Sequence, residues 1–365
     1  MKKGSYLLIV QPLIASYRKD FFDELSTHFD EVDIYSNINV DNGFKKNVQG
    51  KFNSIHTPII GKRGKIYYQA GIISAIIKNR PAAIYITADF RAIHYFLILL
   101  IAKILRIPIF PHGQGLYNKP NPSLIHRFLF KTTISLSSQY ICYTKSTYDS
   151  LINIGINPKK LSIIDNTIVN NYPIKPNERQ NLKNKIIYIG RLREGSNLEL
   201  LFDALKILKN EGLELSLDII GDGEKRAIYD EYVKKLSIDA KFYGAVYDDK
   251  KISDISRESK CGVYPGDAGL SVVHYMSLSL VPIVHNDLTK HMGPEPSYII
   301  DNINGITFNR NDANSLAIAI KKVITNDKIY KKISYNAYET YKKLSNPSMA
   351  EKFIDIIKPY VKVKV

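Results

Sequence analysis

Short apolar runs alternate with stretches of helical periodicity along the whole chain, and this alternation limits the fold more than any other feature. In the first half the expected strands are 6–10, 32–35, 83–87, 107–111 and 140–143. In the second half the expected strands are 185–190, 214–220, 241–243, 262–264, 282–284 and 305–308. Strands that are apolar on both faces and are each followed by a helix are typical of a parallel sheet covered by helices on both sides. We therefore expect an α/β protein with two Rossmann-like domains, for which 365 residues suffice.

A polar segment with prolines separates the two patterns and gives the domain boundaries. We expect a first domain at 1–172, a linker at 173–184 and a second domain at 185–345. Residues 346–365 are expected to form a C-terminal helix that packs back on the first domain. A helix is also expected at 67–78 in the first domain.

The charge of the chain is concentrated in its first half. Lys and Arg number 51 against 35 Asp and Glu, and residues 1–175 hold 22 of the former and 10 of the latter. This excess indicates an anionic partner, namely membrane lipid, nucleic acid or an acidic substrate. The longest apolar stretch, 95–102, is too short for a bilayer span of about 20 residues. Only Cys142 and Cys261 occur, so we expect a reducing cytoplasmic compartment.

In this first half, residues 51–175 hold 16 Lys and Arg against 3 Asp and Glu. Residues 123–134 read as a basic amphipathic helix whose apolar stripe is Leu124, Ile125, Phe128 and Leu129. A second basic cluster consists of Lys62, Arg63 and Lys65. These features predict peripheral attachment to an anionic membrane surface at the inner face of the cell membrane, unless the helix simply covers its own sheet.

Ligands of doubly wound sheets bind outside the carboxyl ends of the strands, so the loops at those ends are the candidate sites. After residue 264 the loop carries Gly266, Asp267 and Gly269 before a helix begins near Leu270 and Ser271, which is an arrangement typical of phosphate sites. The other candidates in the second half are Gly190, Arg191 and Arg193 after one strand, and Gly221 and Asp222 after another. Each loop alone could be a plain turn, and their shared edge favours a ligand site.

In the first half, His112 stands at a strand end beside two glycines and Gln114. A histidine there could stabilise developing charge or bind a hydroxyl group, although a lone histidine is more often structural. His274, His285 and His291 lack the spacing of a metal site, so no metal is expected. Walker-type and dinucleotide-binding motifs do not occur in the sequence.

These residues resemble the group 1 (family 4) glycosyltransferases of the GT-B fold. The likeness is clearest from 185 to 326 and is carried by GRLREGSNLELLFDALKIL, LSLDIIGDGE, KFYGAV and YPGDAGLSVVHYMSLSLVPIV. The resemblance implies two Rossmann-like domains that face each other across a cleft. It also implies transfer of a sugar, with retention and without a metal or other cofactor, from a nucleotide-diphosphate donor, with a UDP-sugar favoured. The implied acceptor is a saccharide or lipid-linked saccharide in capsule, O-antigen or exopolysaccharide synthesis.

The resemblance assigns roles to individual positions. Arg191 matches the phosphate-binding arginine and His112 the histidine beside the reacting sugar. The segment that cradles the diphosphate falls on Gly269, Leu270 and Ser271, and the loop beside the base falls on Tyr243, Gly244 and Val246. The other implied donor-binding residues are Gly190, Arg193, Ser196, Gly221, Asp222, Gly266, Asp267 and His274. The implied acceptor-binding residues are Ser16, Tyr17, Arg18 and Gln114.

The sequence departs from the family pattern in three features. The lysine that follows the arginine by five positions is Ser196, and the paired glutamates fall on Gly266 and His274. The glycines of the first strand–helix loop are absent from 11–18. We expect Arg193 or a first-domain lysine to replace the missing cation, and His274 to replace the ribose-binding glutamate with a neutral hydrogen-bonding group.

Three other functions compete with glycosyl transfer. A nucleotide-sugar epimerase shares the two-domain architecture, and a degenerate sugar-binding subunit would explain the missing lysine and glutamates. Nucleic-acid binding would explain the charge, but the basic half has no recognition helix or RNA-binding aromatic signature, so no nucleic-acid partner is expected.

Overall fold

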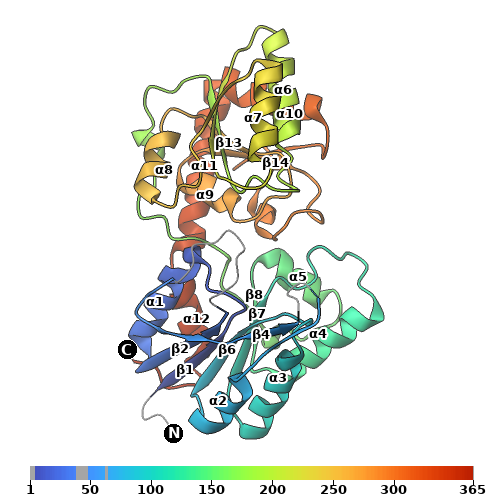
Figure 1. Cartoon of the computed structure of the whole chain (residues 1–365), viewed down its shortest axis with the longest axis vertical. Coiled ribbons are helices and arrows are strands. Elements are labelled where there is room, and N and C mark those ends of the chain that lie inside the picture. The colour runs from blue at the N-terminus through green and yellow to red at the C-terminus, as the bar shows by residue number, and fades with distance from the viewer. Residues whose placement is uncertain (1–4, 38–47, 62–64, 365) are drawn as a thin grey trace. The chain divides into compact units, whose positions relative to one another are not determined.

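The computed structural model describes residues 5–37, 48–61 and 65–364, and it divides the chain into two compact units. Unit 1 comprises residues 1–166 and 347–365, and unit 2 comprises residues 167–346. Figure 1 shows that each unit is a sheet covered by helices, which is the α/β architecture expected from the alternating sequence pattern.

Unit 1 contains a sheet of seven parallel strands in the order β3-β2-β1-β6-β7-β8-β9. The strands are β1 (Tyr6–Val10), β2 (Glu31–Ser36), β3 (Asn53–His56), β6 (Ala83–Thr87), β7 (Ile109–Gly113), β8 (Tyr140–Cys142) and β9 (Leu161–Ile163). A small antiparallel pair joins β4 (Ile59–Gly61) and β5 (Tyr67–Gln69). The helices are α1 (Lys19–His28), α2 (Ile72–Asn79), α3 (Ile93–Leu105), α4 (Leu124–Leu136), α5 (Lys145–Ile152) and α12 (Met349–Ile357).

The central strand β1 shows why this sheet needs helices on both faces. Its side chains alternate between two cores, because neighbouring residues of a strand point to opposite faces. Leu7 and Ile9 pack in the core that α1 and α12 cover, and Leu8 and Val10 pack in the core that α2 and α3 cover.

The C-terminal residues complete the core of unit 1. Phe353 of α12 is buried, and its ring packs edge-on against Tyr85 and Phe110 at centroid distances of 5.2 and 5.8 Å. Lys352 Nζ lies 2.9 Å from Asp165 Oδ2, and Asp165 follows β9. This ion pair holds α12 near the end of that strand. The helix is therefore an integral layer of unit 1.

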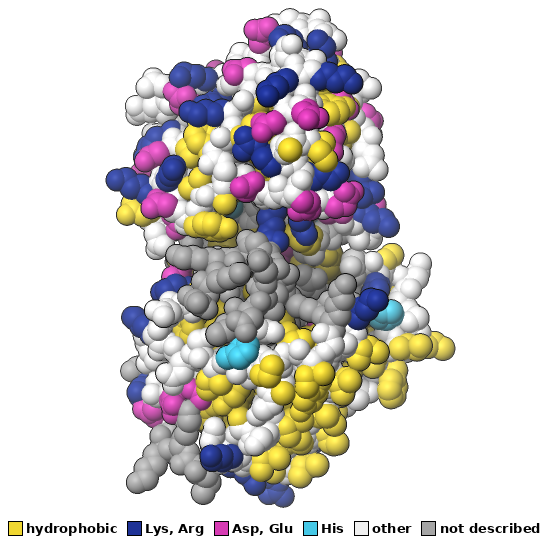
Figure 2. Space-filling view, in the orientation of Figure 1, with side chains coloured by type: hydrophobic (Ala, Val, Ile, Leu, Met, Phe, Trp, Pro, Cys, Tyr) yellow, Lys and Arg dark blue, Asp and Glu magenta, His cyan; other side chains and the backbone are white. Residues whose placement is uncertain are grey.

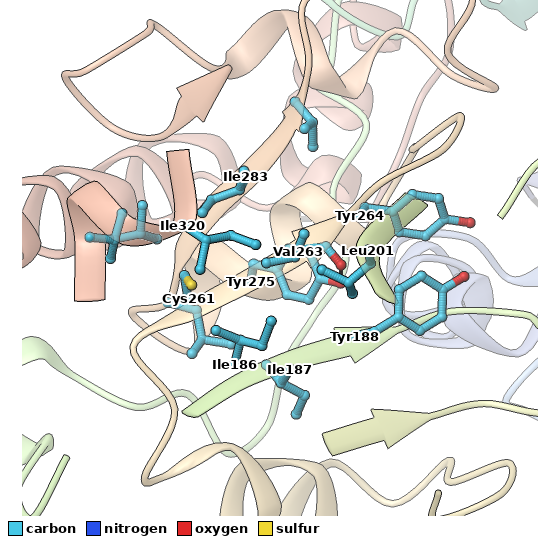
Figure 3. Packing of buried hydrophobic residues seen from close by; sticks show 14 of the residues in the cluster. Ile186, Ile187, Tyr188, Leu201, Cys261, Val263, Tyr264, Tyr275, Ile283 and Ile320 are labelled. Atoms are coloured by element: carbon cyan, nitrogen blue, oxygen red, sulfur yellow. Dashed lines mark hydrogen bonds between the residues drawn. The ribbon is translucent and has the colours of Figure 1, made fainter. Parts of the chain in front are cut away.

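Unit 2 contains six parallel strands in the order β12-β11-β10-β13-β14-β15. The strands are β10 (Lys185–Ile189), β11 (Ser216–Ile220), β12 (Asp239–Phe242), β13 (Cys261–Tyr264), β14 (Val281–His285) and β15 (Ile306–Phe308). The helices are α6 (Leu198–Asn210), α7 (Arg226–Leu236), α8 (Asp249–Ser256), α9 (Ser271–Ser277), α10 (Ala313–Thr325) and α11 (Asp327–Ser345). Figure 3 shows Ile186, Val263 and Ile320 meeting in its core, where the rings of Tyr188 and Tyr264 lie 5.0 Å apart.

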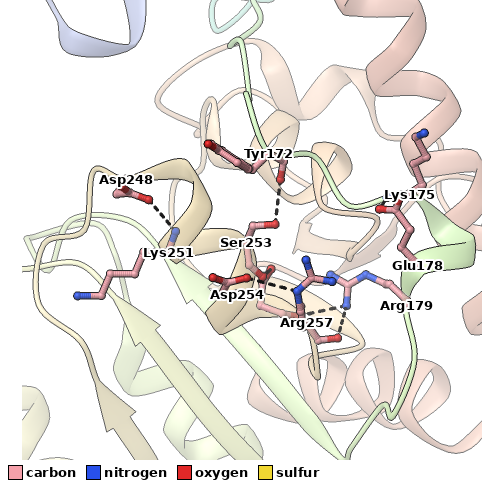
Figure 4. A network of polar contacts seen from close by, with 10 residues as sticks. Tyr172, Lys175, Glu178, Arg179, Asp248, Lys251, Ser253, Asp254 and Arg257 are labelled. Carbon is pink, nitrogen blue, oxygen red and sulfur yellow. Dashed lines mark hydrogen bonds and ion pairs between the residues drawn. The ribbon is translucent and has the colours of Figure 1, made fainter.

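The segment 173–184, expected to be a linker, packs within unit 2. Ile174 is buried in the core of that unit, and the Arg179 side chain is buried as well. Arg179 Nε donates to the Leu278 carbonyl at 2.8 Å, and Nη1 donates to the Ser256 and Arg257 carbonyls at 3.2 and 3.3 Å. Figure 4 shows the Arg179 side chain beside Arg257. Burial lowers the pKa of Arg179 to about 10. A buried guanidinium that satisfies carbonyl groups at the ends of α8 and α9 ties the segment to the unit, so its polar sequence does not make it a free connection.

Candidate active site

The loops that follow β10, β11 and β12 are joined by backbone hydrogen bonds at the carboxyl edge of the unit 2 sheet. Gly190 N donates to the Ile220 carbonyl at 3.0 Å, and Gly221 N donates to the Gly244 carbonyl at 2.8 Å. The amide of Leu192 likewise donates to the carbonyl of Asp222 at 3.0 Å. The predicted loops therefore form one continuous rim at the edge where parallel sheets bind ligands.

Two glycines make this rim possible. Gly221 has φ +149°, and a Cβ atom there would lie 1.7 Å from the Gly190 carbonyl oxygen. A Cβ atom at Gly266 would lie 2.1 Å from the carbonyl oxygen of Gly195, which also accepts a 2.9 Å hydrogen bond from Asp267 N. Any side chain at either position would push the loops apart, so the position of the family's first glutamate cannot hold a carboxylate in this chain.

A cavity of about 250 Å³ opens beside this rim within unit 2. Its lining includes three predicted donor-binding residues, Arg193, Gly266 and Asp267. The remaining lining residues are Glu194, Gly195, Asn197, Glu199, Lys225, Tyr229, Pro265, His285, Arg310 and Asn311. The prediction missed Lys225, His285 and Arg310, although the loops after β14 and β15 lie at the same sheet edge and the strand-end rule would have included them.

Asp267 is the central acid of this cavity. Its Oδ1 atom lies 3.3 Å from His285 Nε2 and 3.3 Å from Arg310 Nη2. Burial lowers the pKa of His285, against the opposing effect of the Asp267 carboxylate. The His285 ring stacks on His291 at 3.7 Å, and His291 Nδ1 accepts a hydrogen bond from the Ala268 amide at 3.1 Å. These contacts fix the loop that carries Asp267 and leave its carboxylate at the cavity wall.

Positive charge is gathered on the loop after β10. The main-chain carbonyl of Arg191 accepts a hydrogen bond from the Tyr188 hydroxyl at 2.9 Å, which orients the loop. Partial burial and the neighbouring Arg193 guanidinium lower the pKa of Arg191. Two guanidinium groups that lie close together at a strand end create a positive electrostatic potential, and this potential favours the binding of an anion.

The three cations at the cavity differ in their partners. Lys225 Nζ lies 3.2 Å from Glu194 and 3.8 Å from Glu199, and the hydrogen bond with Glu194 raises the pKa of Lys225. Arg310 is paired with Asp267, whereas the Arg193 guanidinium contacts the Met292 sulfur. Within the described part of the chain, Arg193 forms no ion pair with a carboxylate.

Ser196, predicted to bind the donor, is buried beneath the loop instead. Its Oγ atom donates to the Arg193 carbonyl at 2.7 Å and lies 2.8 Å from the Tyr229 hydroxyl. The hydroxyl therefore braces the loop from within and does not line the cavity. A lysine in this orientation would be forced into the core, which explains why this chain has a small residue there.

The remaining donor-side predictions lie on the neighbouring loops. Gly269, Leu270 and Ser271 lead into α9 as expected, and Leu270 is its N-terminal cap residue. Tyr243 and Val246 are half-buried on the loop after β12. His274 does not line the cavity; its Nε2 atom is buried without a hydrogen-bond partner among the described residues, and burial lowers the pKa of His274 to about 4.

Unit 1 holds a second cluster, centred on His112 at the end of β7. The His112 Nδ1 atom is hydrogen-bonded with the Tyr85 hydroxyl, and its ring packs on Tyr143 at 4.3 Å. Nε2 is buried and has no hydrogen-bond partner in the described ranges. Burial and the charge of Arg18 hold the pKa of His112 well below its usual range, so the ring is neutral near pH 7.

The structure brings the predicted acceptor residue Arg18 to this cluster. Its guanidinium lies 5.9 Å from the centre of the Tyr143 ring and is hydrogen-bonded with Asn166. Met349 Sδ lies 2.8 Å from Arg18 Nη1. Sequence reasoning missed Tyr85, Tyr143 and Asn166, although Tyr143 directly follows β8 and could have been found by the strand-end rule.

The other predicted acceptor residues are more exposed. Residues Ser16–Arg18 form a short 3-10 helix in which Tyr17 is exposed. Gln114 is exposed, and its carbonyl accepts a hydrogen bond from Thr147 Oγ1 at 3.1 Å. Among the described residues, no group of three or more His, Cys, Asp or Glu side chains is arranged to hold a metal ion. Cys142 and Cys261 are both buried free thiols.

Comparison with known proteins relates unit 2 to a known family. Residues 173–340 match the family model described as glycosyl transferases group 1. No curated protein sequence matches the chain significantly.

Solved structures match nearly the whole chain. Anabaena Alr3699/HepE in complex with UDP and glucose is 14% identical, with a TM-score of 0.71 over 97% of this chain and 100% of that one. The lipopolysaccharide outer core galactosyltransferase WaaB in its apo form is 13% identical, with a TM-score of 0.67 over 98% and 100%. Sucrose-phosphate synthase from Thermosynechococcus elongatus is 14% identical, with a TM-score of 0.71 over 97% and 98%.

At such identities the structural matches establish the shared fold, and the family match supplies the activity. Both agree with the resemblance found in the sequence. The chain is a glycosyltransferase of the GT-B fold, and its residues 173–340 match the group 1 family.

Proposed function

We propose that the protein transfers a sugar from a UDP-sugar to a saccharide or lipid-linked saccharide of a bacterial surface polysaccharide, with retention of anomeric configuration. The observation that carries this proposal is the pair Arg191 and Arg193 at the carboxyl edge of the unit 2 sheet, beside a cavity that holds an acid. UDP is the nucleotide in the HepE complexes, and WaaB is a galactosyltransferase of the lipopolysaccharide outer core. Both neighbours support a donor and a pathway of this kind.

Arg191 is proposed to stabilise the leaving UDP. When the bond between the anomeric carbon and the β-phosphate oxygen breaks, negative charge grows on that phosphate. A fixed guanidinium stabilises the transition state more than the ground state, because the charge it faces is larger there. The same guanidinium groups would supply the positive charge for which other transferases use a divalent metal, so we propose that no metal is needed.

Arg193 is proposed to replace the family lysine. Lys225 and Arg310 are both held by carboxylates, whereas no carboxylate in the described part of the chain neutralises Arg193. Its guanidinium can therefore approach a phosphate without first leaving an ion pair.

Asp267 is proposed to take over from the missing first glutamate. The backbone contact at Gly266 excludes a side chain, and the next residue presents a carboxylate to the cavity. A carboxylate accepts hydrogen bonds from sugar hydroxyl groups, and the hydrogen bond from Arg310 orients it.

His112 is proposed to act beside the reacting sugar as a neutral hydrogen-bonding group. Burial raises the pKa of Tyr85, so its hydroxyl stays protonated and can donate to His112 Nδ1. The proton of the imidazole then resides on Nε2, the buried atom that has no hydrogen-bond partner among the described residues. Nε2 is thereby set to donate to a hydroxyl or a developing negative charge.

Two measurements with a panel of nucleotide sugars test the proposal, namely a sugar-transfer assay and a thermal-shift assay. We expect UDP-sugars to raise the melting temperature of the protein, since a ligand at a hundredfold its dissociation constant stabilises by about 2.7 kcal/mol. Donor turnover that needs no acceptor would favour an epimerase, and a lack of affinity for every nucleotide sugar would favour a non-catalytic subunit. Analysis of the product anomer tests retention, and undiminished activity in a chelator is expected.

A further inference from the structure

The outward face of α3 is apolar along its whole length. Ile93, Leu97, Leu100 and Ile104 follow one another at helical spacing, and they are 53%, 42%, 49% and 68% exposed. The inward residues of the same helix, such as Ile98 and Leu99, are fully buried. A surface helix normally carries polar residues on its outer side, so α3 has two apolar faces and only one of them is used by the core of unit 1.

The neighbouring helix α4 repeats this feature at its N-terminal end. Leu124, Ile125 and Phe128 are 82%, 70% and 67% exposed, whereas Phe130 and Ile134 form the buried side. The stripe predicted from the sequence therefore points to solvent and does not cover the sheet, with the exception of Leu129, which is half-buried. The alternative that Phe128 packs in the core is excluded.

The two exposed stripes belong to one surface, because α3 and α4 pack against each other. Figure 2 shows hydrophobic side chains gathered over the part of unit 1 where Figure 1 places these helices. We call this surface the α3–α4 apolar face, and it consists of Ile93, Leu97, Leu100, Ile104, Leu124, Ile125 and Phe128. Monomeric proteins rarely expose contiguous apolar patches of more than a few hundred Å², and larger ones mark contact sites.

The charges around the α3–α4 apolar face have one sign. No Asp or Glu occurs between Asp89 and Asp149, and seven Lys and Arg lie in the same stretch. Four of these cations are exposed on or next to the two helices, namely Lys103, Arg106, Arg127 and Lys131. An apolar centre with a rim of cations is complementary to a bilayer that has an apolar interior and anionic headgroups.

We propose that the α3–α4 apolar face docks unit 1 on an anionic lipid bilayer, with both helices lying in the headgroup region. Among the described residues no helix is long and apolar enough to cross a membrane, and α3 has 13 residues where a span needs about 20. A second copy of the chain is a poorer occupant, because a two-fold contact would bring the same cations together. Of the second basic cluster predicted from the sequence, Lys65 is exposed, whereas Lys62 and Arg63 lie outside the described residues.

The proposal rests on the surface of unit 1 and not on the donor chemistry of unit 2, so each can fail alone. The first test is co-sedimentation of the full chain with phosphatidylcholine vesicles and with vesicles that also contain phosphatidylglycerol. We expect binding to the anionic vesicles that weakens as salt is added, and little binding to the neutral ones. Equal binding to both, or none to either at low salt, would overturn the proposal.

Paired variants then assign the binding to this face. The variant L97S/L100S/I104S should lower vesicle binding at least tenfold, because three exposed apolar side chains no longer enter the bilayer. The matched control I228S/I300S/I318S removes three comparably exposed apolar side chains from unit 2 and should bind like the wild type. Equal binding by the two variants would show that another surface is responsible.

A second pair separates charge from apolar contact. The variant K103Q/R106Q/R127Q/K131Q should lower the partition coefficient by roughly fivefold for each charge near the surface, and K234Q/K235Q/K331Q/K332Q provides exposed control sites in unit 2. Transfer to a water-soluble acceptor should be unchanged in both, since none of these residues lies in the proposed site. A wild-type dimer that L97S/L100S/I104S converts to a monomer would assign the face to a second copy and refute the lipid proposal.

Discussion

The two units place their polar and apolar groups in opposite ways. Unit 2 keeps its charges at an open cavity where cations and acids are interleaved, and it carries 26 Lys and Arg against 23 Asp and Glu. Unit 1 hides its polar cluster around His112 among aromatic rings, exposes the α3–α4 apolar face, and carries 25 Lys and Arg against 12 Asp and Glu. Two sheets of the same type thus present different surfaces, in keeping with the proposals that unit 2 binds a nucleotide sugar and that unit 1 docks on an anionic bilayer.

The largest effect is expected when Arg191, the cation at the sheet edge of unit 2, is removed. Arg191→Ala should lower turnover by about two orders of magnitude, as the loss of other electrostatic contacts to a developing charge does. Arg257→Ala is a matched control, because this arginine is exposed at the end of α8 and pairs with Asp254. Steady-state kinetics of both folded variants provides the measurement, and near wild-type turnover of Arg191→Ala would remove it from this role.

The polar cluster of unit 1 can be tested through the residue that positions its histidine. Tyr85→Phe removes the hydroxyl that holds His112 Nδ1 but keeps the ring that packs on Phe353. We expect kcat to fall about tenfold with little change in KM, because a misoriented histidine affects the reacting state more than donor binding. Tyr95→Phe removes another buried hydroxyl of unit 1 and should leave kcat unchanged. A fall in thermal stability with normal kcat would make Tyr85 a purely structural residue.

A smaller effect is expected for substitution of His274. This substitution distinguishes a role in donor binding from a role in the packing of unit 2. If its Nε2 atom contacts the donor, His274→Ala should raise the KM for the donor several-fold and lower kcat less. If the ring only fills space, the melting temperature should fall while donor affinity stays the same. Calorimetric titration with UDP together with a thermal scan separates the two outcomes.

The smallest effect concerns stability in acid, which should fall in both units. Burial lowers the pKa of His274 and His291 in unit 2, and of His94 in unit 1, from 6.5 to about 4, and it also lowers the pKa of His285 in unit 2 and of His112 in unit 1. Since the folded-state pKa lies below the unfolded value, this stability is complete above pH 6.5 and is lost as the pH falls from 6.5 toward 4.

The expected change is a decrease of the melting temperature by a few degrees over this interval. The variant H274Q/H291Q should flatten the pH dependence, and His56→Gln, at an exposed histidine of unit 1, should leave it unchanged. Identical pH profiles for the wild type and H274Q/H291Q would contradict the assignment.

Local patterns in the sequence predicted the central strands of both units and the edge strands of unit 2, but they missed the edge strands β3 and β9 of unit 1. Strands such as β1 and β10 are continuous apolar runs because both faces are covered, and this pattern is visible without tertiary information. β3 has the sequence NSIH and is mostly exposed, so its pairing with β2 leaves no local pattern. The helix expected at 67–78 is β5 followed by α2, because Gly71 at φ +87° separates them.

The candidate site could likewise be predicted only in part. The strand-end rule located the loops of Arg191, Gly221 and Gly266, since parallel strands bring their carboxyl ends to one edge. Whether a side chain on such a loop turns outward was not predictable. Ser196 reads as an exposed loop residue, yet it is buried by Tyr229 from α7. The exclusion of a side chain at Gly266 depends on Gly195, which is distant in sequence.

The position of α12 has a consequence for the synthesis of the protein. Residues 1–166 leave the ribosome before α12, but the core of unit 1 also needs Met349, Phe353 and Ile357 from that helix. Until those residues emerge, the apolar side of β1 that α12 covers stays uncovered while unit 2 can already fold. Most of unit 1 is thus synthesised before unit 2, but its core is completed after unit 2. A nascent chain that ends before α12 would expose an apolar surface that chaperones and proteases recognise.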